Sequence, residues 1–232
     1  MPAPLELSGI ESNREAQIAL WKSWQPMFAD PHPGTMSGCR YKPTNNQFGP
    51  GDALVLACML RHLKPARVIE AGSGYSSAVA LDTAEYWLAD TQFTFVDPHP
   101  RRLLSLLKPA DHGKLEILRS KIQDVDPVRF EQLESGDVLF IDSTHIVKTA
   151  SDVVWELFQI LPRLNSDVFI HFLDVFWPFE YPSAWVVGNN RSWKEIYALR
   201  AFLSYNNAFE IVFWATTFGK PRGSASYPAF PS

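Results

Sequence analysis

Acidic side chains follow most of the predicted strands of this chain, at the point where each strand ends. The segments that share this pattern are Glu70 to Gly74, Asp97 to His99, Gln123 with Asp124, Asp142 to His145, and His171 to Asp174. Carboxylates at such positions can accept ribose hydroxyls, hold a divalent cation or take up a proton, and histidine titrates near neutral pH. Because ligands bind outside the carboxyl ends of parallel strands, we expect these groups to line one site.

Short apolar runs alternate with helical patterns from residue 51 onward, and this alternation would bring the strand ends together. It is typical of βαβ units with a parallel sheet. The sequence therefore predicts an α/β fold, Rossmann-like and doubly wound, with a mostly parallel sheet and helices on both faces. The predicted strands are 67–70, 93–97, 115–120, 138–141, 168–173 and 209–218, and the predicted helices are 16–24, 52–63, 76–89, 100–108, 128–133, 149–164 and 192–205.

The segment VIEAGSGYSS, residues 68–77, is typical of a turn from a strand into a helix. Its glycines, Gly72 and Gly74, would let backbone N–H groups approach a ligand closely. Asp97, at the end of the next strand, could accept both hydroxyls of a ribose. A generic strand-to-helix turn, and an Asp that begins a turn before proline, are the structural alternatives.

The same segment disfavours a dinucleotide. The dinucleotide fingerprint has a third glycine where this chain has Ser77. Glu70 would also repel a pyrophosphate, whereas it could receive the cationic amino-acid part of S-adenosylmethionine. An NAD(P)-dependent oxidoreductase is therefore the weaker alternative, and a non-catalytic nucleotide-binding module of the same fold is another.

Three motifs together, E-x-G-S-G-x-S-S, FIDSTH and HFLDVFWPFEYP, resemble the class I S-adenosylmethionine-dependent methyltransferases. The resemblance is to the small-molecule O-methyltransferase branch with Asp-x-x-His after the fourth strand, and it extends from about Leu54 to Phe213. It implies S-adenosylmethionine as cofactor and a small-molecule acceptor. The residues it implies for cofactor binding are Glu70, Gly72, Ser73, Gly74 and Ser76 at the methionine end, Asp97 at the ribose, Gln123 and Asp124 at the adenine, and Asp142 near the methyl group.

Methyl transfer to a hydroxyl requires an acceptor in line with the methyl group and a group that removes its proton. His145 is the predicted general base, and Asp142 is the second predicted catalytic residue, since both follow the fourth strand. A histidine that caps the following helix is the structural alternative. His171 alternates with apolar neighbours, which favours a core histidine.

Asp142 and Asp174 end two predicted neighbouring strands and could share a divalent cation. In the resembling branch the equivalent acids bind Mg²⁺. The catechol-type pattern has an Asn after the second acid, whereas here Val175 follows Asp174 and Leu173 precedes it. A metal would therefore have fewer oxygen ligands.

The segment 176–193 is rich in Phe, Trp and Tyr, and suits either a ring-shaped acceptor or a hydrophobic cover of the sheet. Residues 1–50 are predicted to form a helix-and-loop extension that could act as a lid, in which Tyr41, Lys42 and Asn46 could close over the cofactor. Residues 51–232 are predicted to form the methyltransferase domain. The segment 219–232 is rich in Pro and Gly, so a seventh strand there would be short or missing.

Composition excludes several classes of protein. The net charge is -4 and no run of basic residues occurs, which disfavours nucleic-acid binding. No signal sequence or long apolar run is present, so we expect neither secretion nor a membrane span, and a cytoplasmic protein is the default. The chain has only 2 cysteines, too few for a disulfide scaffold.

Overall fold

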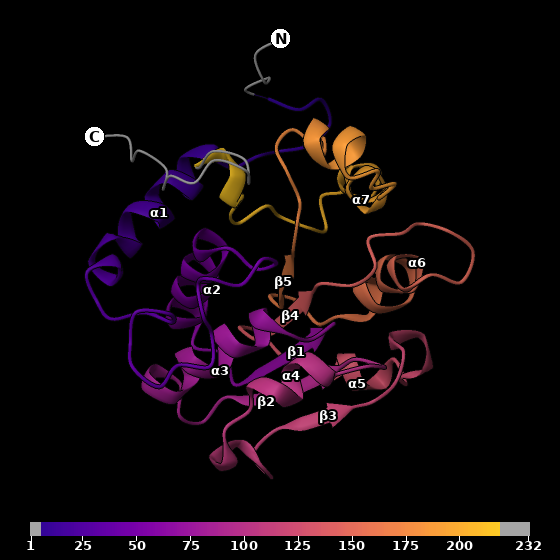
Figure 1. The fold of residues 1–232 in the computed structure, drawn as a ribbon. Coiled ribbons are helices and arrows are strands. Elements are labelled where there is room, and N and C mark those ends of the chain that lie inside the picture. Colours follow the sequence, from indigo (N-terminus) through magenta and orange to yellow (C-terminus); the bar gives the residue numbers. More distant parts are fainter. Residues whose placement is uncertain (1–5, 219–232) are drawn as a thin grey trace.

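The computed structural model describes residues 6–218 of the chain (Figure 1). Five parallel strands form one sheet in the order β3-β2-β1-β4-β5. The strands are β1 (Arg67–Ala71), β2 (Gln92–Val96), β3 (Glu116–Leu118), β4 (Val138–Ile141) and β5 (Phe169–Phe172). The predicted doubly wound α/β fold is confirmed.

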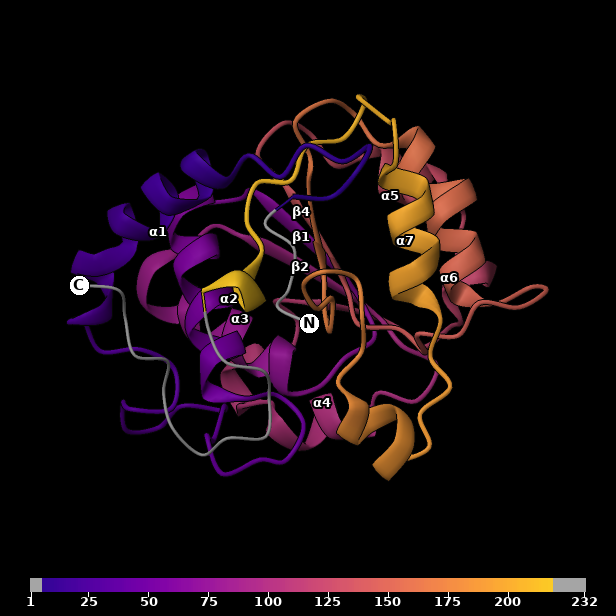
Figure 2. The same cartoon turned by 90° about the horizontal axis from the view of Figure 1, so that it is seen from above.

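Helices connect the strands and cover both faces of the sheet, as Figure 2 shows for α1, α2 and α3 on one side and α5, α6 and α7 on the other. The helix that begins as α6 continues as a π turn over Glu156–Ile160 and a 3-10 turn over Leu161–Arg163. The α-helices are α1 (Arg14–Phe28), α2 (Pro50–Leu63), α3 (Tyr75–Trp87), α4 (Arg101–Leu106), α5 (Val128–Glu131), α6 (Asp152–Trp155) and α7 (Glu195–Leu203).

The strand side chains alternate between two hydrophobic cores. In β4, Val138 and Phe140 pack with α2 and α3, whereas Leu139 and Ile141 pack with α6 and α7. Both sets are buried, because successive side chains of a strand point to opposite faces. Glu70 replaces an apolar residue in this pattern in β1, so a carboxyl group lies inside the sheet domain.

The strand order places the topological switch point between β1 and β4. From β1 the chain proceeds outward through β2 to β3, and then returns to β4 on the other side of β1. The loops after β1 and β4 therefore diverge at the carboxyl edge, which is where ligands bind in open α/β sheets. The turn at 72–74 and the segment 142–145 are these two loops.

The predicted strand at 209–218 is wrong. Residues 209–214 have no regular secondary structure, and Ala215–Thr217 form a 3-10 turn. The backbone of this segment is instead bound by side chains of the α1 region, since Gln17 Oε1 accepts from Trp214 N at 2.7 Å. β5 is consequently the last strand on its side of the described sheet. The segment considered for a seventh strand, 219–232, lies outside the described residues.

The N-terminal extension is fastened to the sheet domain by a buried ion cluster. Arg40 is buried and forms ion pairs with Asp82, Glu85 and Asp111. The backbone N–H groups of Arg40 and Tyr41 also donate to the Asp82 carboxylate, at 3.0 and 2.9 Å. The Tyr41 ring is 1% exposed and packs in the core, so it is not presented on the surface as a lid residue would be.

Candidate functional site

Gly72 brings the loop after β1 against the loop after β4. Its φ is +84°, a left-handed conformation that glycine adopts without strain. A Cβ atom at this position would lie 2.0 Å from the carbonyl oxygen of Asp142, so no other residue fits without a shift of backbone. The predicted cofactor turn and the predicted catalytic segment are therefore in direct contact.

The side chains of the turn are ordered by hydrogen bonds with their neighbours. Ser73 Oγ donates to Asp97 Oδ2 at 2.6 Å, which links the ends of β1 and β2. Gly74 N donates to Ser77 Oγ at 2.9 Å, at the start of α3. Ser77, where a dinucleotide fingerprint has glycine, therefore has a structural role that the sequence alone did not reveal.

Asp97 also has the local contact expected of a turn residue. Its Oδ1 accepts from His99 N at 2.7 Å, which is the hydrogen bond of an Asp-initiated turn. The two oxygens of Asp97 thus bind Ser73 and the following turn. A ribose would have to share or replace the contact with Ser73.

Glu70 is buried beneath the turn and holds its proton unusually tightly. Its side chain accepts from Ser76 Oγ at 2.5 Å, and the residue is 2% exposed. Burial raises the pKa of Glu70 to about 8; the hydrogen bonds from Ser76 and Ser77 oppose this rise. A cationic group bound nearby would favour the ionised form of Glu70.

Gln123 and Asp124 lie in a 3-10 turn, Ile122–Asp124, that follows β3. Gln123 Nε2 donates to the carbonyl of Ala150 at 3.1 Å, which directs the amide toward the start of α6. The side chain of Asp124 is exposed. Both residues lie at the carboxyl edge, as predicted, and their role toward adenine stays a prediction.

His145 lies among three carboxylates from three different parts of the chain. Its Nδ1 is 2.6 Å from Glu195 Oε2, and its Nε2 is 3.6 Å from Asp142 Oδ1 and 3.9 Å from Asp174 Oδ2. The imidazole is buried, whereas the Asp142 side chain is 32% exposed and is the most open of the three acids. The structure therefore brings together His145, Asp142 and Asp174, which the sequence analysis had singled out, and adds Glu195.

These carboxylates keep His145 protonated. Burial alone would lower its pKa, but the interactions with Asp142, Glu195 and Asp174 outweigh it and raise the pKa to about 10. Burial also raises the pKa of Glu195, so the hydrogen-bonded pair retains its shared proton. At neutral pH His145 is consequently an imidazolium, a state in which it donates hydrogen bonds and cannot accept a proton.

The segment before α7 holds His145 in place, and this was not foreseen from the sequence. Lys194 N and Glu195 N both donate to the carbonyl oxygen of His145, at 3.0 and 3.3 Å. The indole of Trp193 lies 4.3 Å from the imidazole between ring centroids. His145 itself has φ +59°, a strained backbone conformation for a residue with a side chain. Only the aromatic composition of 176–193 hinted at this contact.

The predicted metal ligands, Asp142 and Asp174, both face Nε2 of His145. Carboxylate oxygens suit Mg²⁺, and Glu195 Oε1 is buried without a hydrogen-bond partner in the described part of the chain. However, residues 6–218 contain no group of three or more His, Cys, Asp or Glu side chains arranged to hold a metal ion. The residues present thus do not form a complete metal site in this arrangement, and the magnesium prediction is not supported by it.

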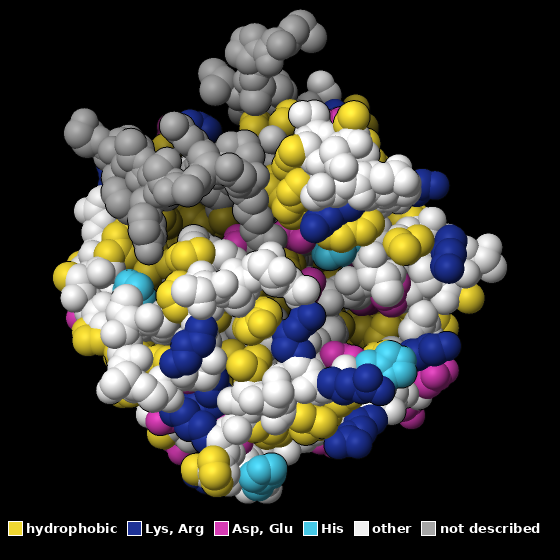
Figure 3. Space-filling model, in the orientation of Figure 1, with side chains coloured by type: hydrophobic (Ala, Val, Ile, Leu, Met, Phe, Trp, Pro, Cys, Tyr) yellow, Lys and Arg dark blue, Asp and Glu magenta, His cyan; other side chains and the backbone are white. Residues whose placement is uncertain are grey.

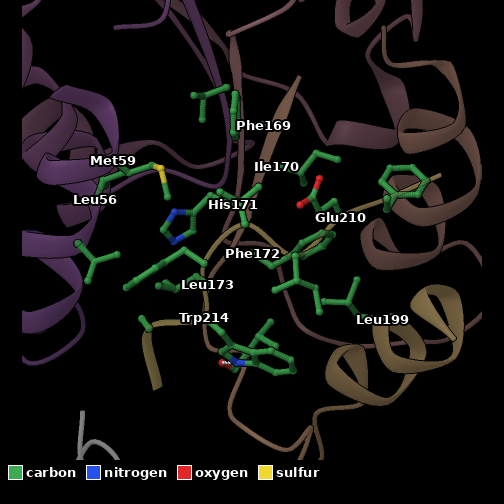
Figure 4. Close-up of a pocket in the computed structure, with 18 of the residues that line it drawn as sticks. Leu56, Met59, Phe169, Ile170, His171, Phe172, Leu173, Leu199, Glu210 and Trp214 are labelled. Atoms are coloured by element: carbon green, nitrogen blue, oxygen red, sulfur yellow. Dashed lines mark hydrogen bonds between the residues drawn. The ribbon is translucent and has the colours of Figure 1, made fainter. Parts of the chain in front are cut away.

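A large cavity of about 1390 Å³ runs along the outer edge of β5. Figure 4 shows His171 between the α2 residues Leu56 and Met59 and the strand residues that line this space. His171 is partly buried and lies beside Phe140, with 4.5 Å between ring centroids, and burial lowers its pKa to about 4. The cavity reaches the cluster around His145 only at Asp174, so it is largely separate from the candidate site.

Comparison with known families identifies the central part of the chain. Residues 69–175, slightly less than half of it, match the family described as "Methyltransferase domain". This region contains the end of β1, the loop at 142–145 and all of β5. The match is to a methyltransferase domain, and it favours the predicted enzyme class over the oxidoreductase and the non-catalytic module.

A single related protein gives less information about this chain than the family match does. A protein of Archaeoglobus fulgidus described as an "Uncharacterized protein" is 31% identical over 140 residues, which cover 56% of this chain and 61% of that protein. The alignment thus spans less than two thirds of the relative.

Two solved structures match this chain with TM-scores below 0.5. The structure described as "cmcI-N160 SAH" has a TM-score of 0.42 at 13% identity, and covers 78% of this chain and 82% of its own. The structure described as "cmcI-D160 Mg-SAM" has a TM-score of 0.40 at 17% identity, and covers 88% of this chain and 75% of its own.

Two further observations bear on partners. Lys and Arg side chains are spread among acidic and apolar ones on the face seen in Figure 3. No helix within residues 6–218 has the length and apolar character that crossing a bilayer requires.

Proposed function

We propose that this chain transfers the methyl group of S-adenosylmethionine to a hydroxyl oxygen of a small molecule. The observation that carries the proposal is the contact between Gly72 and the carbonyl of Asp142. It means that a cofactor bound at the turn after β1 lies next to the acid cluster after β4. A methyl donor and a group able to take a proton are thereby adjacent, as O-methylation requires.

In this proposal the carboxyl ends of β1, β2 and β3 would hold the cofactor. Buried Glu70 would serve its cationic amino group, and Gly72, Ser73, Gly74 and Ser76 would serve the methionine part. Asp97 would accept the ribose hydroxyls, and Gln123 and Asp124 would serve the adenine. The support is the position of these residues at one edge of the sheet and the raised pKa of Glu70, which suits a cationic ligand.

When bound, the sulfonium cofactor supplies the methyl electrophile. A hydroxyl acceptor would take up that methyl group and lose its proton, and the sulfur would keep the electrons of its former bond to the methyl carbon. The protein's part is to orient the acceptor and remove the hydroxyl proton. Because His145 holds a proton at neutral pH, the geometry favours Asp142, the most open carboxylate, as the acceptor of that proton. His145 then positions Asp142, whereas the base role predicted for it would require a neutral imidazole.

The proposal is tested first by binding. Titration of the protein with S-adenosylhomocysteine in a calorimeter should give one site per chain, and Gly74→Val should weaken it, since a larger side chain there would press on Arg102. Absence of detectable binding at millimolar ligand would refute the cofactor assignment. For the predicted divalent cation, activity lost on treatment with a chelator and restored by Mg²⁺ would support a metal held by Asp142 and Asp174.

A further inference from the structure

Arg191 lies at the candidate site without a carboxylate partner. Its guanidinium carbon is 4.2 Å from the centroid of the Trp185 ring and 4.6 Å from that of Trp193. The two indoles are 5.5 Å apart and nearly perpendicular, at 86°, so they form a corner against which the guanidinium rests. Within residues 6–218 no acidic side chain is within ion-pair distance of it.

The corner is attached to the candidate catalytic residues. The indole of Trp193 contacts both Arg191 and His145, the latter at 4.3 Å between ring centroids. Arg191 N also donates to the carbonyl of Trp185 at 3.0 Å, which fixes the backbone of this loop. A guanidinium packed on aromatic faces keeps its N–H groups directed outward in its own plane, where they match the two oxygens of a carboxylate.

Charges of opposite sign lie on the two sets of residues that Trp193 connects. Asp142, Asp174 and Glu195 surround His145, while Arg191, which contacts the same indole, is partly exposed. An acceptor with an anionic group would be repelled by the acids and attracted by Arg191. It would therefore enter with its neutral hydroxyl end toward Asp142 and its anionic end toward Arg191.

We propose that Arg191, held by Trp185 and Trp193, binds the carboxylate of a ring-shaped, hydroxylated acceptor. This role of Arg191 deepens the proposed methyl transfer and rests on it, because it takes the bound molecule to be the methyl acceptor. Binding of the carboxylate itself does not require the cofactor. Trp185 and Trp193 supply the flat apolar walls that suit a ring. Arg191 is thus a specificity-determining residue, because it selects acids over neutral analogues of the same shape.

The experiment compares two probes that differ in charge and hardly in shape, 4-hydroxybenzoate and 4-hydroxybenzamide. Each is titrated calorimetrically into the protein, with and without S-adenosylhomocysteine. The wild-type protein should bind the carboxylate at least about tenfold more tightly than the amide, as for one charge-assisted hydrogen-bonded pair, and the preference should shrink at high salt.

Three variants assign the preference to Arg191. In Arg191→Gln the two probes should bind equally, and Arg191→Lys should retain part of the preference because it keeps the charge but not the planar fork. Arg200→Gln, which removes an exposed Arg from α7, should leave the preference unchanged. Thermal unfolding of each variant shows whether Arg191 is also needed for folding. The comparison of the two probes on the wild-type protein does not depend on any variant.

Equal affinity of the wild-type protein for both probes, or no binding of either one at millimolar concentration, overturns the inference. So does a carboxylate preference that survives in Arg191→Gln. Failure of the proposed function is distinguishable, because it is the loss of S-adenosylhomocysteine binding in the same titrations. Intact cofactor binding with no carboxylate preference removes only the role of Arg191.

Discussion

At the scale of single residues, the site depends on how the environment of each acid sets its proton affinity. His145 is surrounded by Asp142, Asp174 and Glu195, and its pKa is raised to about 10. No cation within residues 6–218 pairs with Glu70, and burial raises its pKa to about 8. In the free protein at pH 7 the histidine is therefore charged and this glutamate is neutral, the reverse of their usual states.

The first prediction concerns the proton acceptor. Asp142→Asn should lower kcat by about 100-fold or more, because a general base typically accelerates a reaction by at least that factor. The affinity for S-adenosylhomocysteine should change little. Between pH 7 and 9 the wild-type kcat should be nearly constant, because this mechanism does not require His145 to lose its proton. The control is Asp90→Asn, an exposed acid before β2 at the opposite end of the strands.

A different dependence of kcat on pH is expected if His145 is the base. If neutral His145 were the base, kcat would rise about tenfold per pH unit toward its pKa of about 10. A rise of that kind, abolished by His145→Gln, would contradict the assignment to Asp142 and restore the role predicted from the sequence.

The second prediction concerns Glu70 and cofactor binding. Below pH 8 its carboxyl is protonated in the free protein, and a cationic amino group bound beside it favours ionisation. S-adenosylhomocysteine binding should therefore release a proton near pH 7, and its affinity should increase from pH 6 toward pH 8. Calorimetry in buffers of different ionisation enthalpy measures the released proton.

Glu70→Gln is the matched control, because it keeps the shape and cannot ionise. It should bind the ligand more weakly at pH 8 and lose the pH dependence between pH 6 and 8. Binding by the wild-type protein without proton release would show that Glu70 does not face the cationic end.

At the scale of elements, the turn after β1 determines how closely two loops approach. Gly72 N donates to the carbonyl of Val96 at 2.9 Å, and Asp142 N donates to that of Ala71 at 2.8 Å. These hydrogen bonds continue the ladders of β2, β1 and β4 beyond the strands. The turn is therefore part of the sheet, and its geometry depends on the neighbouring loops.

The third prediction follows from that geometry. Gly72→Ala should destabilise the protein by at least about 2–3 kcal/mol, because the left-handed φ is strained and the Cβ collides with the carbonyl of Asp142. Gly113→Ala separates the two causes, since Gly113 has φ +80° but open space around the added atom. It should cost only about 1–2 kcal/mol. Urea unfolding measures both, and equal losses would argue against the contact.

At the scale of the whole molecule, the N-terminal extension and the sheet domain share a buried charge cluster. Arg40 is the cation, Asp82 is fully buried, and Asp111 is nearly so. A hydrophobic contact adds to it, in which Trp21 and Trp24 of α1 pack against Cys58 of α2. We expect the extension to fold as one unit with the domain predicted for residues 51–232.

The fourth prediction tests this unit. Arg40→Met should cost about 3–5 kcal/mol, because it leaves the carboxylates of Asp82 and Asp111 buried without their cation. Arg163→Met, which removes a half-exposed Arg 3.5 Å from Glu131, should cost less than about 1 kcal/mol. A wild-type unfolding curve with two transitions, the first insensitive to Arg40→Met, would show that the extension is a separate unit.

The sequence alone determined the strands and helices of the sheet domain, and the edge of the sheet at which the candidate site residues lie. Apolar periodicity and turn residues are local signals, so strands β1 to β5 and the residues that end them were predictable. The positions of Glu70, Gly72, Asp97, Asp142 and His145 followed, because parallel strands must end at one edge of the sheet.

Only the tertiary structure decided which groups meet across that edge. Glu195 reaches His145 from 50 residues away, and Arg191 reaches it through Trp193. The protonation of His145 depends on charges from several elements and on burial, and neither can be predicted from the local sequence. The strand predicted at 209–218 failed for the same reason. Its apolar pattern suited a strand, but side chains of the distant α1 region took the backbone hydrogen bonds that pairing requires.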